Sequence, residues 1–237
     1  MEESHSAVVK VIEAMKDDKQ IKFFIKLIPK DRFVDAVNHM CTFFLADEPI
    51  CKSLNVKNDP QAVEEFKALF KIALEDNLSV AAFVENPQGG KPIIAALNVL
   101  YLGGKGQKID FSQYISKSDK VQRVMQVMEA SAADVNFEKL YGCDKYIGGF
   151  GLSVDPVFRG NAIGYHLLMA RNEVGKAKNI PLTMTVFTSP ISAKLASRAG
   201  FQVLSEKLRD TLVDENGQLL VPACKTESFK CMGKDIK

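Results

Sequence analysis

In the first half of the chain, the spacing of apolar and polar positions switches between strand-like and helix-like. The run Ile21–Ile28 predicts a strand, and Lys30–Phe44 then gathers apolar residues on one helical face. From Pro60 onward, QAVEEFKALFKIALED predicts an amphipathic helix with its acidic residues early, where the helix dipole favours them. Leu78–Val84 and Pro92–Leu102 are β-rich runs around a Gly-Gly connection, which predicts a hairpin.

The second half continues to alternate between the two periods. Ser118–Ala133 predicts a helix, and Tyr146–Val154 predicts a strand with an unusually high glycine content, a sign of a bulge or of a ligand close to the backbone. The remaining predicted elements are a helix at Gly164–Lys178, a strand at Pro181–Phe187, a helix at Ser189–Ala199, and two strands at Phe201–Leu208 and Leu219–Val221 that flank the hairpin signature Asp-Glu-Asn-Gly at positions 214–217.

Length and composition favour one globular domain. With 237 residues, 46% hydrophobic and 25% charged, the chain is long enough for a well-buried core. We expect residues 20–237 to form that domain. Ala7–Met15 has mixed helical spacing, so residues 1–19 are expected to be an N-terminal extension or a short helix.

Charge and hydropathy limit the partners that we expect. The net charge of +2 provides no overall field to attract nucleic acid or an anionic membrane. The first residues lack the apolar core of a signal peptide, and no apolar run reaches the roughly 18 residues that a spanning helix needs. We therefore expect a soluble cytoplasmic protein that binds neither nucleic acid nor membranes, and a monomer rather than an oligomer.

The cysteines and histidines do not indicate a metal centre. Five widely spaced cysteines without a C-x-x-C pair disfavour both a disulfide framework and a zinc site, and the three histidines are scattered. We expect reduced thiols, no metal, and surface or packing roles for His5, His39 and His166.

The segment Leu152–Leu168 carries the first chemical signal. A strand ends at Val154, a turn with small residues follows, and a helix then begins. Such a turn leaves backbone N–H groups unpaired at the positive end of a helix, which favours phosphate binding. Gly160, Ala162 and Gly164 keep side-chain bulk away from the main chain. The pattern fits neither the nucleotide P-loop nor the dinucleotide fingerprint.

This segment resembles the acetyl-CoA pyrophosphate loop of GCN5-related N-acetyltransferases (GNATs). The resemblance rests on six residues, with Ala162 standing where the family has its middle glycine: Val154, Pro156, Phe158, Arg159, Gly160 and Gly164. It implies a mixed α/β GNAT fold, with a central, mostly antiparallel, twisted sheet flanked by helices and splayed between its fourth and fifth strands. It also implies cofactor-binding roles for Leu152, Ser153 and Val154 along the pantetheine arm, and for Arg159, Gly160, Asn161, Ala162, Ile163, Gly164, Ser189 and Lys194.

Two further segments narrow the resemblance to insect arylalkylamine N-acetyltransferases. Thr188–Phe201 resembles the helix beside the cofactor thiol, but Ala196 occupies the position of the usual acidic tyrosine, so Ser192 and Thr188 become the candidate acids. Cys41–Val56 resembles a segment in which a glutamate is the general base, which assigns that role to Glu48. The alternative is that Glu48 only caps the turn before Pro49.

The resemblance implies direct transfer of an acetyl group from acetyl-CoA to a small arylalkylamine such as serotonin, dopamine or tyramine. Several alternatives stay open: agmatine, a polyamine or a protein lysine as acceptor, a longer acyl group, or an acyl-CoA binder without catalysis. Aromatic walls for the substrate are expected among Phe43, Phe44, Phe83, Tyr101 and Phe187.

Overall fold

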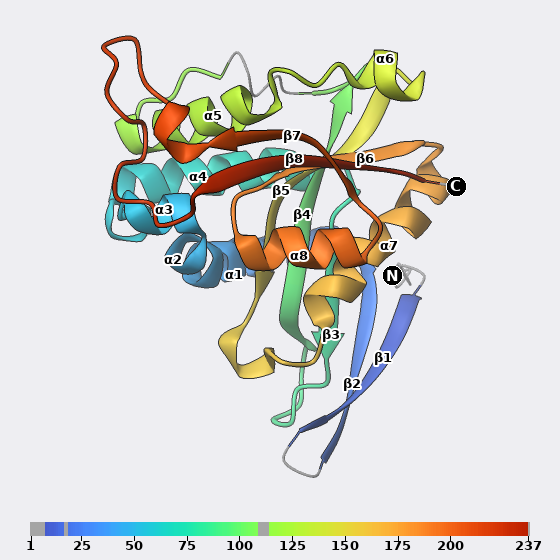
Figure 1. Ribbon diagram of the computed structural model, residues 1–237. Coiled ribbons are helices and arrows are strands. Elements are labelled where there is room, and N and C mark those ends of the chain that lie inside the picture. Colours follow the sequence, from blue (N-terminus) through green and yellow to red (C-terminus); the bar gives the residue numbers. More distant parts are fainter. Residues whose placement is uncertain (1–7, 17–18, 109–113, 237) are drawn as a thin grey trace.

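The computed structural model describes residues 8–16, 19–108 and 114–236 and contains one eight-stranded sheet (Figure 1). The strand order is β1-β2-β3-β4-β5-β6-β8-β7, and every neighbouring pair is antiparallel except β5 and β6, which are parallel. The strands are β1 Val8–Lys16, β2 Lys19–Leu27, β3 Val80–Val84, β4 Ile93–Gly104, β5 Lys145–Val154, β6 Leu182–Phe187, β7 Gln202–Leu208 and β8 Ser228–Asp235.

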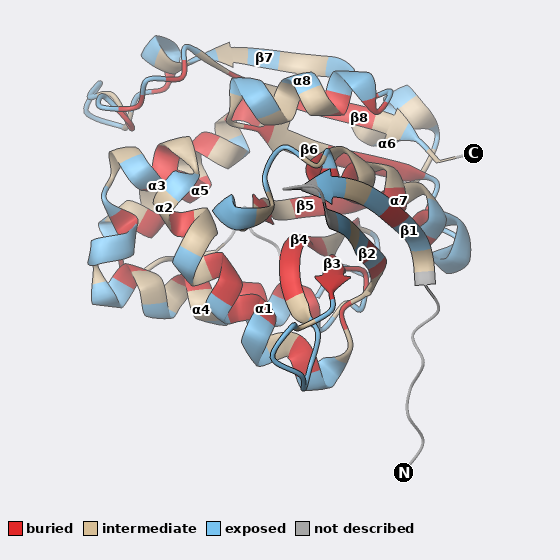
Figure 2. Cartoon of the chain, turned by 90° about the horizontal axis from the view of Figure 1, so that it is seen from below, coloured by how far each residue is buried: buried red, intermediate tan, exposed pale blue. Residues whose placement is uncertain are grey.

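Helices cover both faces of the sheet, and the buried residues concentrate between helices and strands (Figure 2). The helices are α1 Phe33–His39, α2 Leu45–Asp47, α3 Pro49–Ser53, α4 Pro60–Leu74, α5 Asp119–Ala132, α6 Phe137–Tyr141, α7 Ile163–Lys178 and α8 Pro190–Arg198. On one face, α1, α4 and α5 pack with residues such as Leu97 and Val99, and on the other face α7 packs with Leu100 and Ile147. None of the helices in the described part of the chain is both long and apolar enough to cross a membrane.

The N-terminal segment is a strand, so the helix expected over Ala7–Met15 is wrong. β1 pairs antiparallel with β2, with Val11 opposite Phe24 and Glu13 opposite Lys22. Ile12 is buried while Val11 and Met15 are exposed, so apolar side chains lie on both faces of this strand. The alternation of apolar and polar residues that usually indicates a strand is therefore absent from the sequence here. Residues 1–7 lie outside the described part of the chain, and the single domain over 20–237 stays a prediction.

The C-terminal hairpin also differs from the expectation. β7 pairs with β8, whereas Leu219 makes only an isolated bridge to Val213 and Leu219–Val221 is not a strand. The predicted turn does form, with Gly217 at φ +75°. β8 was not predicted from the sequence because lysines interrupt its apolar residues, although Phe229, Cys231 and Met232 are all buried.

The helix expected over Lys30–Phe44 is interrupted in a way that positions Glu48. α1 ends at His39, a single π-helical turn follows at Met40–Phe44, and α2 ends at Asp47. Glu48 is extended, with φ −62° and ψ 126°, and precedes α3 as its N-cap. A π-turn inside a helical segment often marks a functional site, because the extra residue redirects the side chains that follow.

The expected splay of the sheet is confirmed between β5 and β6, the fourth and fifth strands counted from β2. These strands pair only at Ile147 with Thr183 and at Gly148 with Met184, whereas β5 pairs with β4 along most of its length. Phe150 is a bulge, because Val99 lies opposite Gly151 and Leu100 lies opposite Gly149. Beyond Gly148, one edge of β5 is therefore not covered by β6.

Candidate active site

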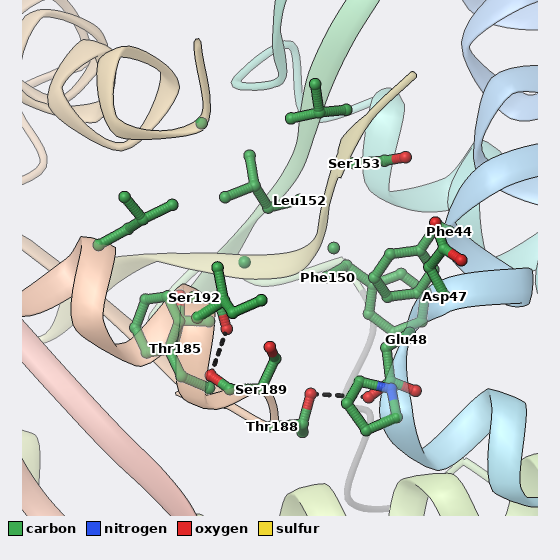
Figure 3. Close-up of a pocket in the computed structure, with 18 of the residues that line it drawn as sticks. Phe44, Asp47, Glu48, Phe150, Leu152, Ser153, Thr185, Thr188, Ser189 and Ser192 are labelled. Carbon is green, nitrogen blue, oxygen red and sulfur yellow. Dashed lines mark hydrogen bonds between the residues drawn. The ribbon is translucent and has the colours of Figure 1, made fainter. Parts of the chain in front are cut away.

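A cavity of about 740 Å³ lies where β5 and β6 separate. Its lining comes from α2 and α3, from the α7 and α8 N-termini, and from the diverging strands (Figure 3). Of the fourteen residues predicted to be catalytic or cofactor-binding, twelve line it: Glu48, Leu152, Ser153, Val154, Arg159, Gly160, Ala162, Ile163, Gly164, Thr188, Ser189 and Ser192. Segments far apart in the sequence thus contribute to a single cavity.

Glu48 and Thr188 approach each other from opposite sides of the cavity (Figure 3). The Thr188 hydroxyl donates to Glu48 Oε1 at 2.7 Å, and the backbone N–H of Cys51 donates to Glu48 Oε2 at 2.6 Å. Glu48 therefore does cap α3, as the alternative interpretation held, but that contact occupies one carboxylate oxygen only. The other oxygen faces Thr188, which leaves Glu48 free to take part in proton transfer as well.

Ser192 is turned toward its own helix. Its hydroxyl donates to the Ser189 carbonyl at 2.9 Å, a contact within the first turn of α8. Ala196, at the position where the family usually has tyrosine, is fully buried in a small core with Phe187 and Phe201. Of the two predicted acids, Thr188 is the one in contact with the predicted base.

The loop before α7 has the geometry of an anion site. Gly160 has φ +88°, and Ala162 has φ +53° and serves as the N-cap of α7 without a side-chain hydrogen bond. The first N–H groups of this 16-residue helix therefore have no capping side chain, and the helix dipole adds a partial positive charge there. A Cβ atom added at Gly164 would lie 3.4 Å from Leu195 Cδ1 and 3.7 Å from Leu152 Cδ2, at ordinary contact distances.

Ala162 is a non-glycine residue in the left-handed region, which costs about 1–2 kcal/mol. We expect Ala162→Gly to raise the free energy of unfolding by about 0.5–1 kcal/mol, since the glycine also loses more chain entropy on folding. Urea unfolding measures this change. The matched control, Ala193→Gly within helical α8, is expected to lower stability by about 1 kcal/mol. If Ala162→Gly lowered the free energy of unfolding, the claim that Ala162 is strained in the native state would be wrong.

Three of the predicted cofactor residues are either engaged in other contacts or lie outside the cavity. Arg159 lines the cavity but is ion-paired with Asp47 and donates to the Val154 carbonyl at 3.2 Å. Asn161 points back into the loop, donating to the Phe158 carbonyl at 3.0 Å. Lys194 is exposed on α8 and is not among the cavity-lining residues. A ligand phosphate near Arg159 would have to compete with Asp47.

A buried histidine contacts Ser153 on the open edge of β5. His39 Nε2 lies 3.1 Å from Ser153 Oγ, and the imidazole packs edge-on against Phe43. Burial lowers the pKa of His39 to about 4, although the charge of Asp155 opposes the shift. His39 is therefore neutral at pH 7, and its packing role is consistent with the sequence interpretation.

His39 makes stability depend on pH. Its folded pKa of about 4 lies below the unfolded value of 6.5, so the unfolded chain binds more protons between these values. The stabilisation is complete above pH 6.5 and is lost as the pH falls toward 4. We expect the free energy of unfolding to fall by about 2 kcal/mol between pH 7 and pH 5 through this residue. Urea unfolding of His39→Gln at pH 7 and pH 5 should show a smaller fall in stability than the wild type, because the contribution of His39 is absent. If the variant and the wild type had the same pH dependence, His39 would not be its source.

The part of the cavity next to α4 and α5 is apolar and aromatic. Of the aromatic residues predicted as walls, Phe43, Phe44 and Phe187 line the cavity, whereas Tyr101 lines a separate cavity of about 280 Å³ and Phe83 lines neither. The other residues of this wall were not predicted from the sequence: Phe66, Val124, Met125, Met128 and Phe150. Among the residues that the structure describes, the carboxylates lining the main cavity are Asp47 and Glu48.

A buried polar network on the α7 side was also missed. The Arg171 guanidinium is 1% exposed and donates from Nε to Asn98 Oδ1 at 2.9 Å, while Asn98 Nδ2 donates to the Gly151 carbonyl at 2.7 Å. Arg171 lines the cavity as well. Within the described residues, no group of three or more His, Cys, Asp and Glu side chains is arranged to hold a metal ion.

Solved structures with this arrangement are found by fold comparison, whereas no protein-family model and no curated protein sequence matches the chain. A candidate arylalkylamine N-acetyltransferase 7 from the yellow fever mosquito Aedes aegypti has a TM-score of 0.87 and 28% identity, over 98% of this chain and 95% of that one. Arylalkylamine N-acetyltransferase 2 from Aedes aegypti has a TM-score of 0.77 and 22% identity, over 91% and 99% of the two chains. A Drosophila melanogaster polyamine N-acetyltransferase, which forms N-acetylagmatine, has a TM-score of 0.72 and 15% identity, over 90% and 99%. The chain thus has the fold of the GCN5-related N-acetyltransferases, in the form seen in the insect arylalkylamine N-acetyltransferases.

Proposed function

We propose that the protein is an acetyl-CoA-dependent N-acetyltransferase that acts on the primary amine of a small arylalkylamine. The observation that carries the proposal is the contact between Glu48 and Thr188 inside a cavity that spans the splayed strands. A carboxylate and a hydroxyl in contact at this point supply a proton acceptor and a proton donor for one transfer. The structural likeness to N-acetyltransferases supports the same reaction class.

The residues present fit a CoA thioester. The uncapped α7 N-terminus and Gly160 leave backbone N–H groups accessible to a diphosphate, and the open edge of β5 at Leu152, Ser153 and Val154 offers main-chain groups to an extended arm. Arg159 is available to a phosphate once its contact with Asp47 is exchanged. When bound, acetyl-CoA supplies the activated acetyl group.

Glu48 is proposed to take a proton from the ammonium form of the amine, because a protonated amine has no lone pair with which to attack a carbonyl carbon. Backbone N–H groups at the β5 bulge polarise the carbonyl oxygen. The new C–N bond forms as the C–S bond breaks, and Thr188 donates its proton to the departing sulfur. Because Thr188 is hydrogen-bonded to Glu48, the proton taken by Glu48 can replace the one that Thr188 gives up. The Glu48 carboxylate freed in this way then takes the second proton from the nitrogen and passes it to solvent, which leaves a neutral amide and a neutral thiol.

The composition of the cavity favours an aromatic acceptor over a polyamine. Phe44, Phe66, Phe150 and Met125 form an apolar wall suited to an aromatic ring, while the cavity's two carboxylates are adjacent residues, Asp47 and Glu48. An agmatine or polyamine has a second cationic group, which would need another carboxylate well separated from this pair. The proposal includes a soluble, cytoplasmic, monomeric enzyme whose partners are the amine and acetyl-CoA.

The test is thiol release from acetyl-CoA in the presence of tryptamine, serotonin, dopamine, tyramine, agmatine, spermidine and a lysine peptide. Turnover with the aromatic amines is expected, together with thermal stabilisation by acetyl-CoA alone. Turnover only with agmatine or spermidine would keep the reaction and overturn the acceptor. Stabilisation without turnover of any amine would favour an acyl-CoA binder, and no stabilisation would overturn the cofactor site.

A further inference from the structure

Arg171 carries a buried positive charge beside the point where β5 and β6 separate. Besides its bond to Asn98, its Nη1 donates to Thr183 Oγ1 at 3.2 Å and to Thr185 Oγ1 at 2.7 Å, and the guanidinium lies 5.7 Å from the centre of the Phe201 ring. All three hydrogen-bond acceptors are neutral, and no carboxylate of the described residues forms an ion pair with Arg171. Among the described residues, the charge therefore has no counter-ion.

Packing alone does not account for a buried arginine at this position, because its burial costs free energy. Burying a charge without an opposite charge costs several kcal/mol, and an apolar side chain of similar size would fill the same space at a lower cost. Burial lowers the pKa of Arg171 to about 9, opposed only by the nearby Tyr101, so the guanidinium is still charged at pH 7. Its Nη2 makes no hydrogen bond with any residue that the structure describes.

Arg171 Nη2 lies next to Gly149, and both residues line the main cavity. A Cβ atom added at Gly149 would lie 2.6 Å from Arg171 Nη2 and 2.8 Å from Thr185 Oγ1, so only glycine leaves room for the guanidinium there. Gly149, Arg171 and Thr185 all line the main cavity. Gly149 is also the first β5 residue beyond the last pair with β6, Gly148 with Met184.

This position is close to where the acyl group would lie, an assignment that rests on the proposed function. The pantetheine arm of CoA would begin at the α7 N-terminus and extend along the β5 edge from Val154 toward Gly149. There it would reach the point where β5 and β6 begin to separate. The group at the end of that arm is then directed toward Arg171. A negatively charged acyl group at this position would supply the counter-ion that the described residues do not.

We propose that Arg171 Nη2 binds a carboxylate at the far end of the acyl group, so that the site accepts the CoA thioester of a short dicarboxylic acid as well as acetyl-CoA and binds it more tightly. The transfer itself is unchanged: the C–N bond forms, the C–S bond breaks, and the product is an amide that keeps a free carboxylate. An acetyl donor fits the same space but leaves the guanidinium without a counter-ion.

Binding of two unreactive thioethers tests the donor class without any amine: S-(3-carboxypropyl)-CoA and S-butyl-CoA, which differ by a carboxylate in place of a methyl group. Calorimetry of the intact chain is expected to give at least tenfold tighter binding of the carboxylated compound. Equal affinities, or tighter binding of S-butyl-CoA, would overturn the donor class and leave the acyltransferase proposal standing. If neither compound bound, both proposals would fail.

Two variants assign the preference to Arg171. Arg171→Met, which fills the space without charge, is expected to bring the ratio of the two affinities to within about twofold of one. Arg171→Lys, which keeps a charge but not the planar fork, should retain part of the preference. A full preference in a folded Arg171→Met protein would overturn the role of this residue. If that variant does not fold, the wild-type ratio and the Lys variant still decide the proposal.

Discussion

Replacing Glu48 with Gln is expected to lower turnover at pH 7 by about 10²-fold, the usual contribution of a general base. The Gln carbonyl oxygen can still accept from the backbone N–H of Cys51, so the cap of α3 is preserved while the base is removed. The rate of the variant should rise about tenfold per pH unit toward the amine pKa near 10, because the fraction of free amine rises by that factor. Steady-state kinetics from pH 6 to pH 9 measure both effects, and a pH profile like that of the wild type would contradict the role.

Glu48→Ala separates the cap from the base. It removes both functions, so it should match Glu48→Gln in kinetics and in addition lose about 1 kcal/mol of stability. If Glu48→Gln were fully active while Glu48→Ala were impaired, the carboxylate would act only as a cap. Thermal unfolding of the two variants beside their kinetics distinguishes these outcomes.

Thr188 and Ser192 are expected to differ when their hydroxyls are removed. Thr188→Val deletes the donor that contacts Glu48, so we expect turnover to fall about tenfold or more with little change in acetyl-CoA affinity. Ser192→Ala removes a hydroxyl already bonded to the Ser189 carbonyl, and its effect on turnover should be smaller. The reverse order in kcat would reassign the proton donor to Ser192.

Local sequence patterns were sufficient for the elements around the cofactor loop. Strand, turn and helix from Tyr146 to Lys178 follow from glycine content and helical periodicity, and the structure places β5 and α7 there. Glu48 and Thr188 were named from two separate motifs, but their hydrogen bond joins residues 140 positions apart and depends on the tertiary fold. No local pattern could predict that contact.

Arg171 and Asn98 show where sequence interpretation fails for a physical reason. Arginine in the helical stretch LLMARNEV is ordinarily a solvated residue, because burying its charge is costly. Asparagine in the apolar run of β4 gives no sign that its side chain bridges two other elements. In the fold, Asn98 donates to the Gly151 carbonyl next to the bulge at Phe150, and Arg171 in turn donates to Asn98, so the two side chains pair with each other in the interior.

Asn98→Leu is therefore expected to lower the free energy of unfolding by about 3 kcal/mol, since it leaves both the Arg171 Nε–H and the Gly151 carbonyl without partners in the interior. Urea unfolding measures the loss. In an Arg171→Met background only the carbonyl is left unpaired, so the same substitution should cost about half as much.

Equal costs in the two backgrounds would mean that Asn98 and Arg171 are not coupled. A coupled pair has a functional consequence, because Asn98 holds the carbonyl next to the bulged residue and Arg171 reaches β6 through Thr183 and Thr185. The same four hydrogen bonds then fix the bulge, the separation of the strands and the guanidinium that faces the cavity. The stability of this network and the geometry of the donor site should consequently change together in any variant at these positions.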